Sequence, residues 1–352
     1  MKFLKKLGCK ARIGRIAAMS LALAATSAGL AEAPAETTAA APAQTHAEKL
    51  REKLDSKDRD YVFVTMHRGD WRHAPENSVD AIKGSIAMGA DIVELDVALT
   101  KDGEYVLLHD GALDRVSNGK GKSKDLTLAE IKKYRLVKGD KDRTVTDYEI
   151  LTLKEALELT RGKILVNLDK FPRDPRGIAE YVKKLGMERE VILKGTFMPD
   201  DLKKKMKEQW ASVEDGTLYF MPILWLSHGG KESEKAGVSA KKTAEAAKKS
   251  AAMFEAWQSE GRAPGAYELC IPKEEPVDVL KRLQATQRYG GPRIWINTLW
   301  DNLCAGHTDE RGFNGDPDGS WGWALKQGAT MIQTDRPAEL IKYLESKGRR
   351  NL

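Results

Sequence analysis

Four polar residues have the types and spacing that cleavage of a phosphate ester requires. His67 and His109 each follow a short apolar run, and Glu94 and Asp96 lie two positions apart within another such run. Residues i and i+2 of a strand project to the same face, so both carboxylates enter one space. Imidazoles exchange protons near neutral pH, and paired carboxylate oxygens bind hard cations. The set therefore predicts metal-assisted cleavage of a phosphate ester.

Short motifs surround these residues in a fixed order. They are HRG at 67–69, PEN at 75–77, ELD at 94–96, TKDG at 100–103, HD at 109–110, LDR at 113–115 and NGKG at 118–121. Together they resemble the signature of the glycerophosphodiester phosphodiesterase family, a branch of the TIM-barrel phosphodiesterases. Gly328 and the TDRP run at 334–337 resemble the closing strand of that family. Each motif alone is a weak signal, since a His-Arg pair is often a surface or packing feature and an E-x-D pair a polar strand end, but the ordered set favours a functional interpretation.

The resemblance implies that Glu94 and Asp96 are two ligands of a divalent cation. The third ligand would come from the strand expected at 163–169, where the family carries E-x-K and this chain reads NLDK. By strand phase Asn167 takes the place of the glutamate and Asp169 that of the lysine, whereas a small shift makes Asp169 the carboxylate ligand. We favour Asp169, with Asn167 as a neutral ligand or water holder, because carboxylates bind hard cations better than amides do. Mg²⁺ or Ca²⁺ is expected rather than zinc, since the set lacks thiolates.

His67 and His109 are then the expected acid/base pair. One accepts a proton from the attacking oxygen, and the other donates a proton to the leaving alkoxide. The resemblance suggests that His109 serves the leaving group, but the residues alone leave this assignment open. They also leave open whether water or the substrate's own glycerol hydroxyl attacks. Arg68 is expected to clamp a phosphate oxygen with its planar guanidinium, and a structural pair with Glu76 is the alternative.

Residues near the ends of later strands are further candidates. Lys194 ends the fourth expected strand and is a candidate phosphate contact in place of the missing lysine, unless it extends to solvent. Trp300 follows the seventh strand and is a candidate pocket wall, with a core aromatic as the alternative. His307 and Asp309 are interpreted as loop polars.

Apolar strand-like runs alternate with amphipathic helical patterns along the chain. The expected strands are 61–66, 91–98, 163–169, 190–195, 217–224, 266–271, 293–298 and 329–334. The expected helices are 77–88, 153–161, 176–186, 199–209, 237–259, 275–288, 319–327 and 337–347. Eight such units predict an α/β fold, a TIM (β/α)8 barrel. The resemblance places a small insertion at about 104–150, after the second strand, and Asn77 is expected to cap the first helix.

The amino-terminal segment has the pattern of a signal peptide. Six basic residues precede the apolar or small residues 16–30, and a small-residue cleavage site lies near Ala31. The apolar run is short and rich in alanine, so we expect no stable membrane span after cleavage and an exported protein, periplasmic or secreted. Residues 32–50 are rich in alanine, proline and threonine and are expected to form a flexible linker. The barrel would then occupy 51–352.

The formal net charge of +6 comes from that leader. Cleavage after Ala31 removes six basic residues and no acidic ones, which leaves 52 of each sign. A nearly neutral protein gives no indication of nucleic-acid binding. Cys270 and Cys304 remain without a CxxC pattern, so free or loosely paired thiols are expected.

These features predict an exported, metal-dependent hydrolase that cleaves glycerophosphodiesters to glycerol 3-phosphate and an alcohol. One alternative is a phospholipase D-like enzyme that acts on intact lipids and needs an apolar rim for membrane docking. The other alternative is a non-catalytic barrel that binds phosphodiesters, which the altered third strand suggests. Retention of both histidines favours the hydrolase.

Overall fold

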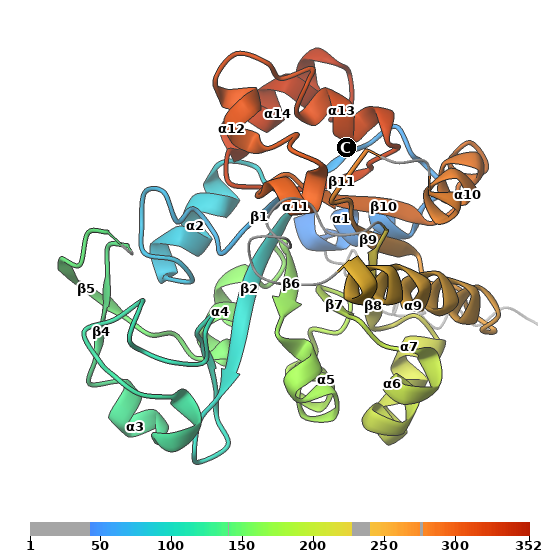
Figure 1. Ribbon diagram of the computed structural model, residues 1–352. Helices are drawn as coiled ribbons and strands as arrows, with labels where there is room; N and C mark the ends of the chain where they lie inside the picture. Colours follow the sequence, from blue (N-terminus) through green and yellow to red (C-terminus); the bar gives the residue numbers. More distant parts are fainter. Residues whose placement is uncertain (1–42, 140, 227–239, 275–276) are drawn as a thin grey trace, which may run out of the picture. The chain divides into compact units, whose positions relative to one another are not determined.

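Eight parallel strands form a closed barrel within the unit Gln44–Leu352 of the computed structural model (Figure 1). The strands are β1 (Phe63–Met66), β2 (Ile92–Leu99), β6 (Leu165–Asp169), β7 (Val191–Gly195), β8 (Tyr219–Trp225), β9 (Ala266–Cys270), β10 (Arg293–Asn297) and β11 (Met331–Thr334). Neighbouring strands pair in parallel, and β1 closes the ring by pairing with both β11 and β2. The predicted TIM barrel is confirmed, and each strand overlaps its predicted range.

The structure describes residues 43–352 except 140, 227–239 and 275–276. The predicted signal peptide at 1–31 and most of the predicted linker therefore lie outside the described residues. Within the described part of the chain, no helix combines the length and apolar character needed to cross a bilayer.

A helix follows each strand and packs on the outside of the barrel. These helices are α2 (Val79–Ala87), α4 (Leu153–Thr160), α5 (Pro175–Lys184), α6 (Pro199–Met206), α9 (Ala240–Gln258), α10 (Asp278–Gln287), α13 (Trp321–Lys326) and α14 (Pro337–Ser346). Shorter turns are η2 (Phe171–Arg173), η3 (Lys207–Trp210), α7 (Ala211–Glu214), α11 (Asp301–Cys304) and α12 (Asp309–Phe313). Outward strand residues such as Val64 and Leu95 share one large apolar core with the helices. Because the strands are buried on both faces, they read as nearly continuous apolar runs.

Helix α1 (His46–Asp55) closes the amino-terminal end of the barrel. Its buried Leu50 packs with Phe63, Trp295 and other residues that point inward from the starts of the strands. The linker predicted over 32–50 is wrong for its last five residues, which are helical. Their apolar residues recur at helical spacing, so the segment gains a face that the barrel buries.

The inside of the barrel changes from apolar to polar toward the carboxyl ends of the strands. Ile92 belongs to the apolar cluster beneath, and Glu94 and Asp96 follow on the same face of β2. Asn167 and Asp169 of β6 lie opposite Glu94 and Asp96 in the strand register. The predicted sharing of one face by each pair is therefore confirmed.

The chain between β2 and α4 forms a small insertion. Its elements are β3 (Tyr105–Leu107), η1 (Ser123–Asp125), α3 (Leu128–Ile131), β4 (Arg135–Val137) and β5 (Val145–Glu149). Strand β3 pairs antiparallel with the far end of β2, and β4 and β5 form a separate hairpin. Leu113 and Ile131 belong to a small apolar core of the insertion itself. The insertion predicted after the second strand is confirmed, and it places His109 two residues after the end of β3.

Asn77 has a different role from the predicted helix cap. Ser78 caps α2, and its Oγ accepts a hydrogen bond from Ala81 N at 3.2 Å. Asn77 has a φ of 59° and directs its amide at Asp96. Its Nδ2 donates to Asp96 Oδ2 at 3.1 Å, and its Oδ1 accepts from Asp96 N at 3.2 Å. The capping prediction is wrong because the amide orients a carboxylate of the barrel mouth instead.

The two cysteines form no disulfide, which agrees with the expected free thiols. Cys270 and Cys304 are both buried, and Cys304 Sγ donates to Trp300 O at 3.3 Å. Burial raises the pKa of both thiols, so neither is a reactive nucleophile.

If α1 seals the barrel, truncating its inner face will destabilise the whole unit. We expect Leu50→Ala to lower the free energy of unfolding by about 2–5 kcal/mol, because it leaves a cavity in a fully buried cluster. Urea unfolding of this variant, with Lys49→Ala on the exposed face as the control, measures the effect. Equal stability of the two variants would show that the helix is not part of the core.

Candidate active site

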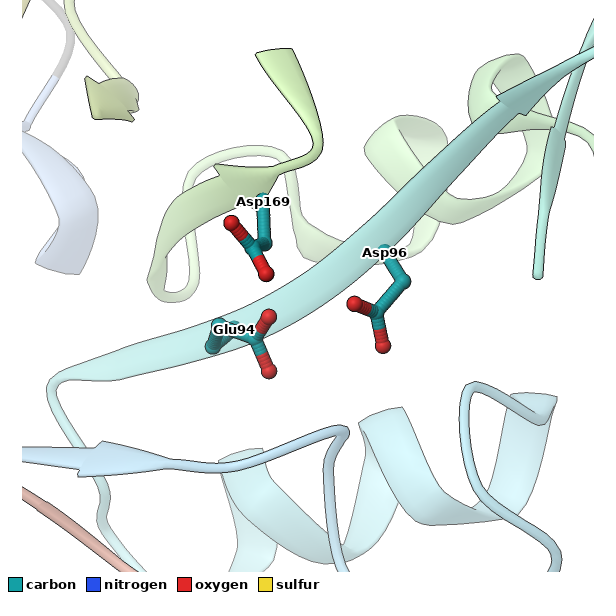
Figure 2. A group of neighbouring side chains, drawn as sticks. All are labelled: Glu94, Asp96 and Asp169. Carbon is teal, nitrogen blue, oxygen red and sulfur yellow. The ribbon is translucent and has the colours of Figure 1, made fainter. Parts of the chain in front are cut away.

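Three carboxylates converge at the carboxyl end of the barrel strands (Figure 2). Glu94 and Asp96 extend from β2 and Asp169 from the end of β6, and one oxygen of each lies within 4.8 Å of the others. Glu94 and Asp96 are fully buried. Burial, together with the charges of Asp96 and Asp169, raises the pKa of Glu94 well above its ordinary value. Three acids held this closely favour the binding of a cation, because its positive charge offsets their mutual repulsion.

The donor atoms fit a hard divalent cation. Asp96 Oδ1 and Asn167 Oδ1 are both buried, and neither accepts a hydrogen bond within the described part of the chain. Asn167 Nδ2 donates to Ile192 O at 3.0 Å, which fixes the amide. Carboxylate and amide oxygens are the ligands that Mg²⁺ and Ca²⁺ prefer. The cluster is therefore consistent with the predicted metal site.

Lys170 adds a cation to this cluster. Its Nζ donates to Asp169 Oδ2 at 2.5 Å and lies 3.5 Å from Asp96 Oδ1. Burial opposes ionisation of Asp169, but the charges of Lys194 and Lys170 hold its pKa below the ordinary range. Lys170 is not among the predicted site residues, because adjacent residues of a strand point to opposite faces. Its φ of 64° turns the chain at the end of β6 and removes that restriction.

Lys194 lies deeper in the barrel than Lys170. Its Nζ is 3.1 Å from Glu268 Oε2 and lies over the Trp295 ring, 5.2 Å from the centroid. Glu268 Oε1 in turn accepts from Asn297 Nδ2 at 2.8 Å. Because Lys194 is only 4% exposed, the alternative that it extends to solvent is wrong. Its phosphate contact stays a prediction.

His67 follows β1 and is held by a carboxylate from the end of β11. His67 Nδ1 lies 2.9 Å from Asp335 Oδ1, which also accepts from Trp71 Nε1 at 2.7 Å. Burial opposes ionisation of Asp335, but the hydrogen bond from His67 contributes to a pKa below its ordinary value. We assign the imidazole proton to Nδ1, which leaves Nε2 for proton transfer. Half-exposed Trp300 meets His67 edge to face, with centroids 5.5 Å apart.

Asp309 holds the backbone of Asp335, the partner of His67. Its Oδ2 accepts from Asp335 N at 2.7 Å. Its Oδ1 accepts from three side chains, those of Thr298, Trp321 and Thr334. Burial raises the pKa of Asp309 to about 6 against these donors. The interpretation of Asp309 as a loop polar is wrong, since it is a buried anchor for the Asp335 backbone.

His109 has a similar carboxylate partner. His109 Nδ1 lies 2.6 Å from Asp110 Oδ1, and Asp110 Oδ2 accepts from Arg115 Nε at 2.7 Å. Burial opposes ionisation of Asp110, but these hydrogen bonds hold its pKa below the ordinary value. The preceding Leu108 donates its backbone N–H to Asp96 O at 3.0 Å. His109 therefore follows a residue bonded directly to the strand that carries the carboxylates.

Glu76 accepts hydrogen bonds both from Arg68, which follows β1, and from Arg115 of the insertion. Arg68 N donates to Glu94 Oε2 at 3.0 Å, and its Nη1 donates to Glu76 Oε2 at the same distance. Arg68 Nε lies 3.5 Å from Asp96 Oδ2. Glu76 also accepts from Arg115, at 2.7 and 2.8 Å. The structural pair considered as the alternative for Arg68 is therefore present, and its phosphate contact stays a prediction.

The chain is similar to one protein family over most of its length. The model of the glycerophosphoryl diester phosphodiesterase family matches residues 67–339. The chain is 41% identical over 141 residues to a glycerophosphodiester phosphodiesterase of Caldanaerobacter subterraneus, a match covering 38% of this chain and 57% of that protein. It is 40% identical over 133 residues to human glycerophosphodiester phosphodiesterase 1, covering 38% and 40%. The matched segments thus span about half the length of these relatives.

Solved structures with the same fold include two phosphodiesterases. A glycerophosphoryl diester phosphodiesterase of Parabacteroides distasonis has a TM-score of 0.59 at 20% identity, covering 86% of this chain and 93% of its own. A phosphodiesterase of Oleispira antarctica, solved with the product sn-glycerol-3-phosphate, has a TM-score of 0.51 at 17% identity. That match covers 81% of this chain and 97% of the other.

If Asp335 fixes the tautomer of His67, removing its charge will impair turnover. We expect Asp335→Asn to lower kcat for a chromogenic phosphodiester by about 10–100-fold, because the amide no longer holds the proton on Nδ1. Thermal unfolding and steady-state kinetics of this variant are compared with those of exposed Asp201→Asn. A wild-type kcat for Asp335→Asn would remove Asp335 from the account.

Proposed function

The chain belongs to the glycerophosphoryl diester phosphodiesterase family, and we propose that it hydrolyses glycerophosphodiesters to glycerol 3-phosphate and an alcohol. One observation carries the proposal: three carboxylates converge at the carboxyl end of the barrel strands, and the histidines that follow β1 and β3 are each paired with an aspartate through Nδ1. The product bound to the Oleispira phosphodiesterase supports the choice of glycerol 3-phosphate.

In this proposal Glu94, Asp96 and Asp169 hold a divalent cation, Mg²⁺ or Ca²⁺. When bound, the cation neutralises the charge of the diester and polarises phosphorus. Asn167 Oδ1 is a neutral donor beside the carboxylates, for the ion or for a water molecule. Asn77 fixes Asp96 from the other side with two hydrogen bonds.

The histidines carry the proton transfers. With Nδ1 committed to an aspartate, His67 and His109 each present Nε2 to the reacting atoms. One accepts the proton of the attacking oxygen, from water or the glycerol hydroxyl, and the other protonates the leaving alkoxide. The family resemblance assigns the leaving group to His109. Asp335 and Asp110 hold the two rings and stabilise each imidazolium as it forms.

Cationic side chains are proposed to contact the phosphate. Lys170 is the strongest candidate, because its ammonium already lies among the carboxylates near the barrel mouth. Arg68 can turn the free edge of its guanidinium toward a phosphate oxygen while it keeps Glu76. Lys194, which lies deeper in the barrel beside Glu268, attracts the phosphate through its positive charge. Trp300 forms a wall of the pocket beside His67.

We also propose that the protein is exported and acts in the periplasm or outside the cell. The support is the basic, then apolar, leader at 1–31 with its small-residue cleavage site. The amino-terminal sequence of the protein recovered from the cell envelope or medium tests this, and an intact leader would contradict it.

The activity itself is tested with glycerophosphocholine. We expect the purified protein to release glycerol 3-phosphate when Mg²⁺ or Ca²⁺ is supplied, and to release none after chelation. His67→Ala and His109→Ala should each lower kcat by at least about 10²-fold, since each removes a proton-transfer group. Exposed His73→Ala is the matched control and should keep the wild-type rate.

Other outcomes would point to the two alternatives. Cleavage of phospholipid vesicles without cleavage of soluble head-group diesters would indicate a phospholipase. Stoichiometric binding of a glycerophosphodiester that is recovered intact would indicate a binding protein.

A further inference from the structure

His109 and its partner Asp110 are both partly exposed, unlike the other histidine and its partner. The side chains of His109 and Asp110 are 30% and 37% exposed. Those of His67 and Asp335 are only 9% and 13% exposed. An exposed ion pair by itself fixes its side chains poorly, because water competes for both groups. Asp110 therefore needs a further contact if it is to keep the ring of His109 oriented toward reacting atoms.

Arg115 supplies that contact from the same insertion. Its Nε donates to Asp110 Oδ2 at 2.7 Å, while Asp110 Oδ1 lies 2.6 Å from His109 Nδ1. Each oxygen of the Asp110 carboxylate thus has its own partner, so the carboxylate cannot rotate without losing a hydrogen bond. The direction of the imidazole ring is set by a carboxylate that is itself held in place.

Arg115 is in turn held by Glu76, a mostly buried carboxylate. Arg115 Nη1 and Nη2 donate to the two oxygens of Glu76 at 2.8 and 2.7 Å, a parallel pair of bonds that suits a planar guanidinium. Burial opposes ionisation of Glu76, but the hydrogen bonds from Arg115 and the charge of Arg68 hold its pKa below the ordinary value. Glu76 therefore stays charged and fixes the plane of the Arg115 guanidinium.

The backbone that carries Arg115 is fixed as well. The guanidinium of Arg143 donates to the carbonyl oxygens of Arg115 and Ser117. The neighbouring Leu113 is fully buried in the apolar core of the insertion. Both the backbone and the guanidinium of Arg115 thus have defined positions, which a single exposed salt bridge would not provide.

The same network reaches the carboxylate cluster. Arg68 is the second partner of Glu76, and its backbone N–H donates to Glu94 Oε2 at 3.0 Å. Arg68 Nε lies 3.5 Å from Asp96 Oδ2. The position of His109 is therefore set relative to the carboxylates of β2 and not relative to the insertion alone.

We propose that Arg115 is a positioning residue that enables His109 to protonate the leaving alcohol, an inference that rests on the proposed hydrolysis of glycerophosphodiesters. In that step the bond from phosphorus to the alcohol oxygen breaks, the oxygen keeps the electron pair, and it takes the proton from His109 Nε2. Arg115 does not contact the substrate in this role. It holds Asp110, which keeps the proton on Nδ1 and directs Nε2 toward the alcohol oxygen.

Two substrates that share glycerol phosphate and differ in the alcohol test this role. Choline leaves as an alkoxide that must be protonated, whereas p-nitrophenolate is stable near neutral pH and leaves without a proton. We expect Arg115→Gln to lower kcat for glycerophosphocholine by about 10–100-fold, because the ring of His109 is no longer directed at the alcohol oxygen. With the p-nitrophenyl ester of glycerol phosphate the rate should stay close to that of the wild type. His109→Ala should show the same dependence on the alcohol.

Two further variants separate positioning from a contribution to the fold. Arg135→Gln is the matched control, because Arg135 also belongs to the insertion and pairs with a glutamate, Glu149, at 3.2 Å. It should keep the wild-type rate with both substrates. Arg115→Lys keeps the positive charge but lacks the planar fork, so we expect a smaller loss with the same dependence on the alcohol. Thermal unfolding of each variant accompanies the kinetics.

The outcomes distinguish this inference from the proposed function. Equal losses with the two substrates in Arg115→Gln would show that Arg115 supports only the fold, and would overturn the inference. A wild-type rate of Arg115→Gln with glycerophosphocholine would overturn it too, as would equal losses with the two substrates in His109→Ala. Failure of the wild type to cleave either substrate would instead contradict the proposed function itself.

Discussion

Like charges held together inside the barrel mouth are the constraint on which the rest of the site depends. Glu94, Asp96 and Asp169 share a small space, and two of them are fully buried. Such a group is stable only when cations and donors surround it. Lys170 and Lys194 supply charge, and further donors come from the chain after β1. A bound divalent cation would stabilise the three carboxylates further by adding positive charge. Apolar side chains fill the amino-terminal end of the barrel, so this polar group lies at the opposite end, the barrel mouth.

The histidines are likewise held by carboxylates, His67 at a nearly buried position and His109 at a partly exposed one. Each ring uses Nδ1 for an aspartate, so its free nitrogen is defined by a hydrogen bond rather than by packing alone. Asp335 is itself fixed by Asp309 through its backbone N–H. The ends of β1, β3 and β11, which are far apart in the chain, thereby position the two histidines that we propose to transfer protons.

Strand periodicity made much of the fold and site predictable. The alternation of side chains placed Glu94 with Asp96, and it placed Asn167 with Asp169. The same rule could have identified Asp335, which directly follows the last strand. It could not identify Lys170 or the true role of Asn77, because both have positive φ values and lie outside regular structure. The start of helix α1 was missed because the alanine- and proline-rich residues that precede it were extended as a linker to residue 50.

The central claim is that Asp169, with Glu94 and Asp96, completes a cation site at the barrel mouth. Crystals grown with Mn²⁺, an oxygen-seeking ion with a strong anomalous signal, test it most directly. The account predicts an anomalous peak bonded to oxygens of all three carboxylates, with Lys170 displaced from Asp169. A peak coordinated without Asp169, or located away from this cluster, would contradict it.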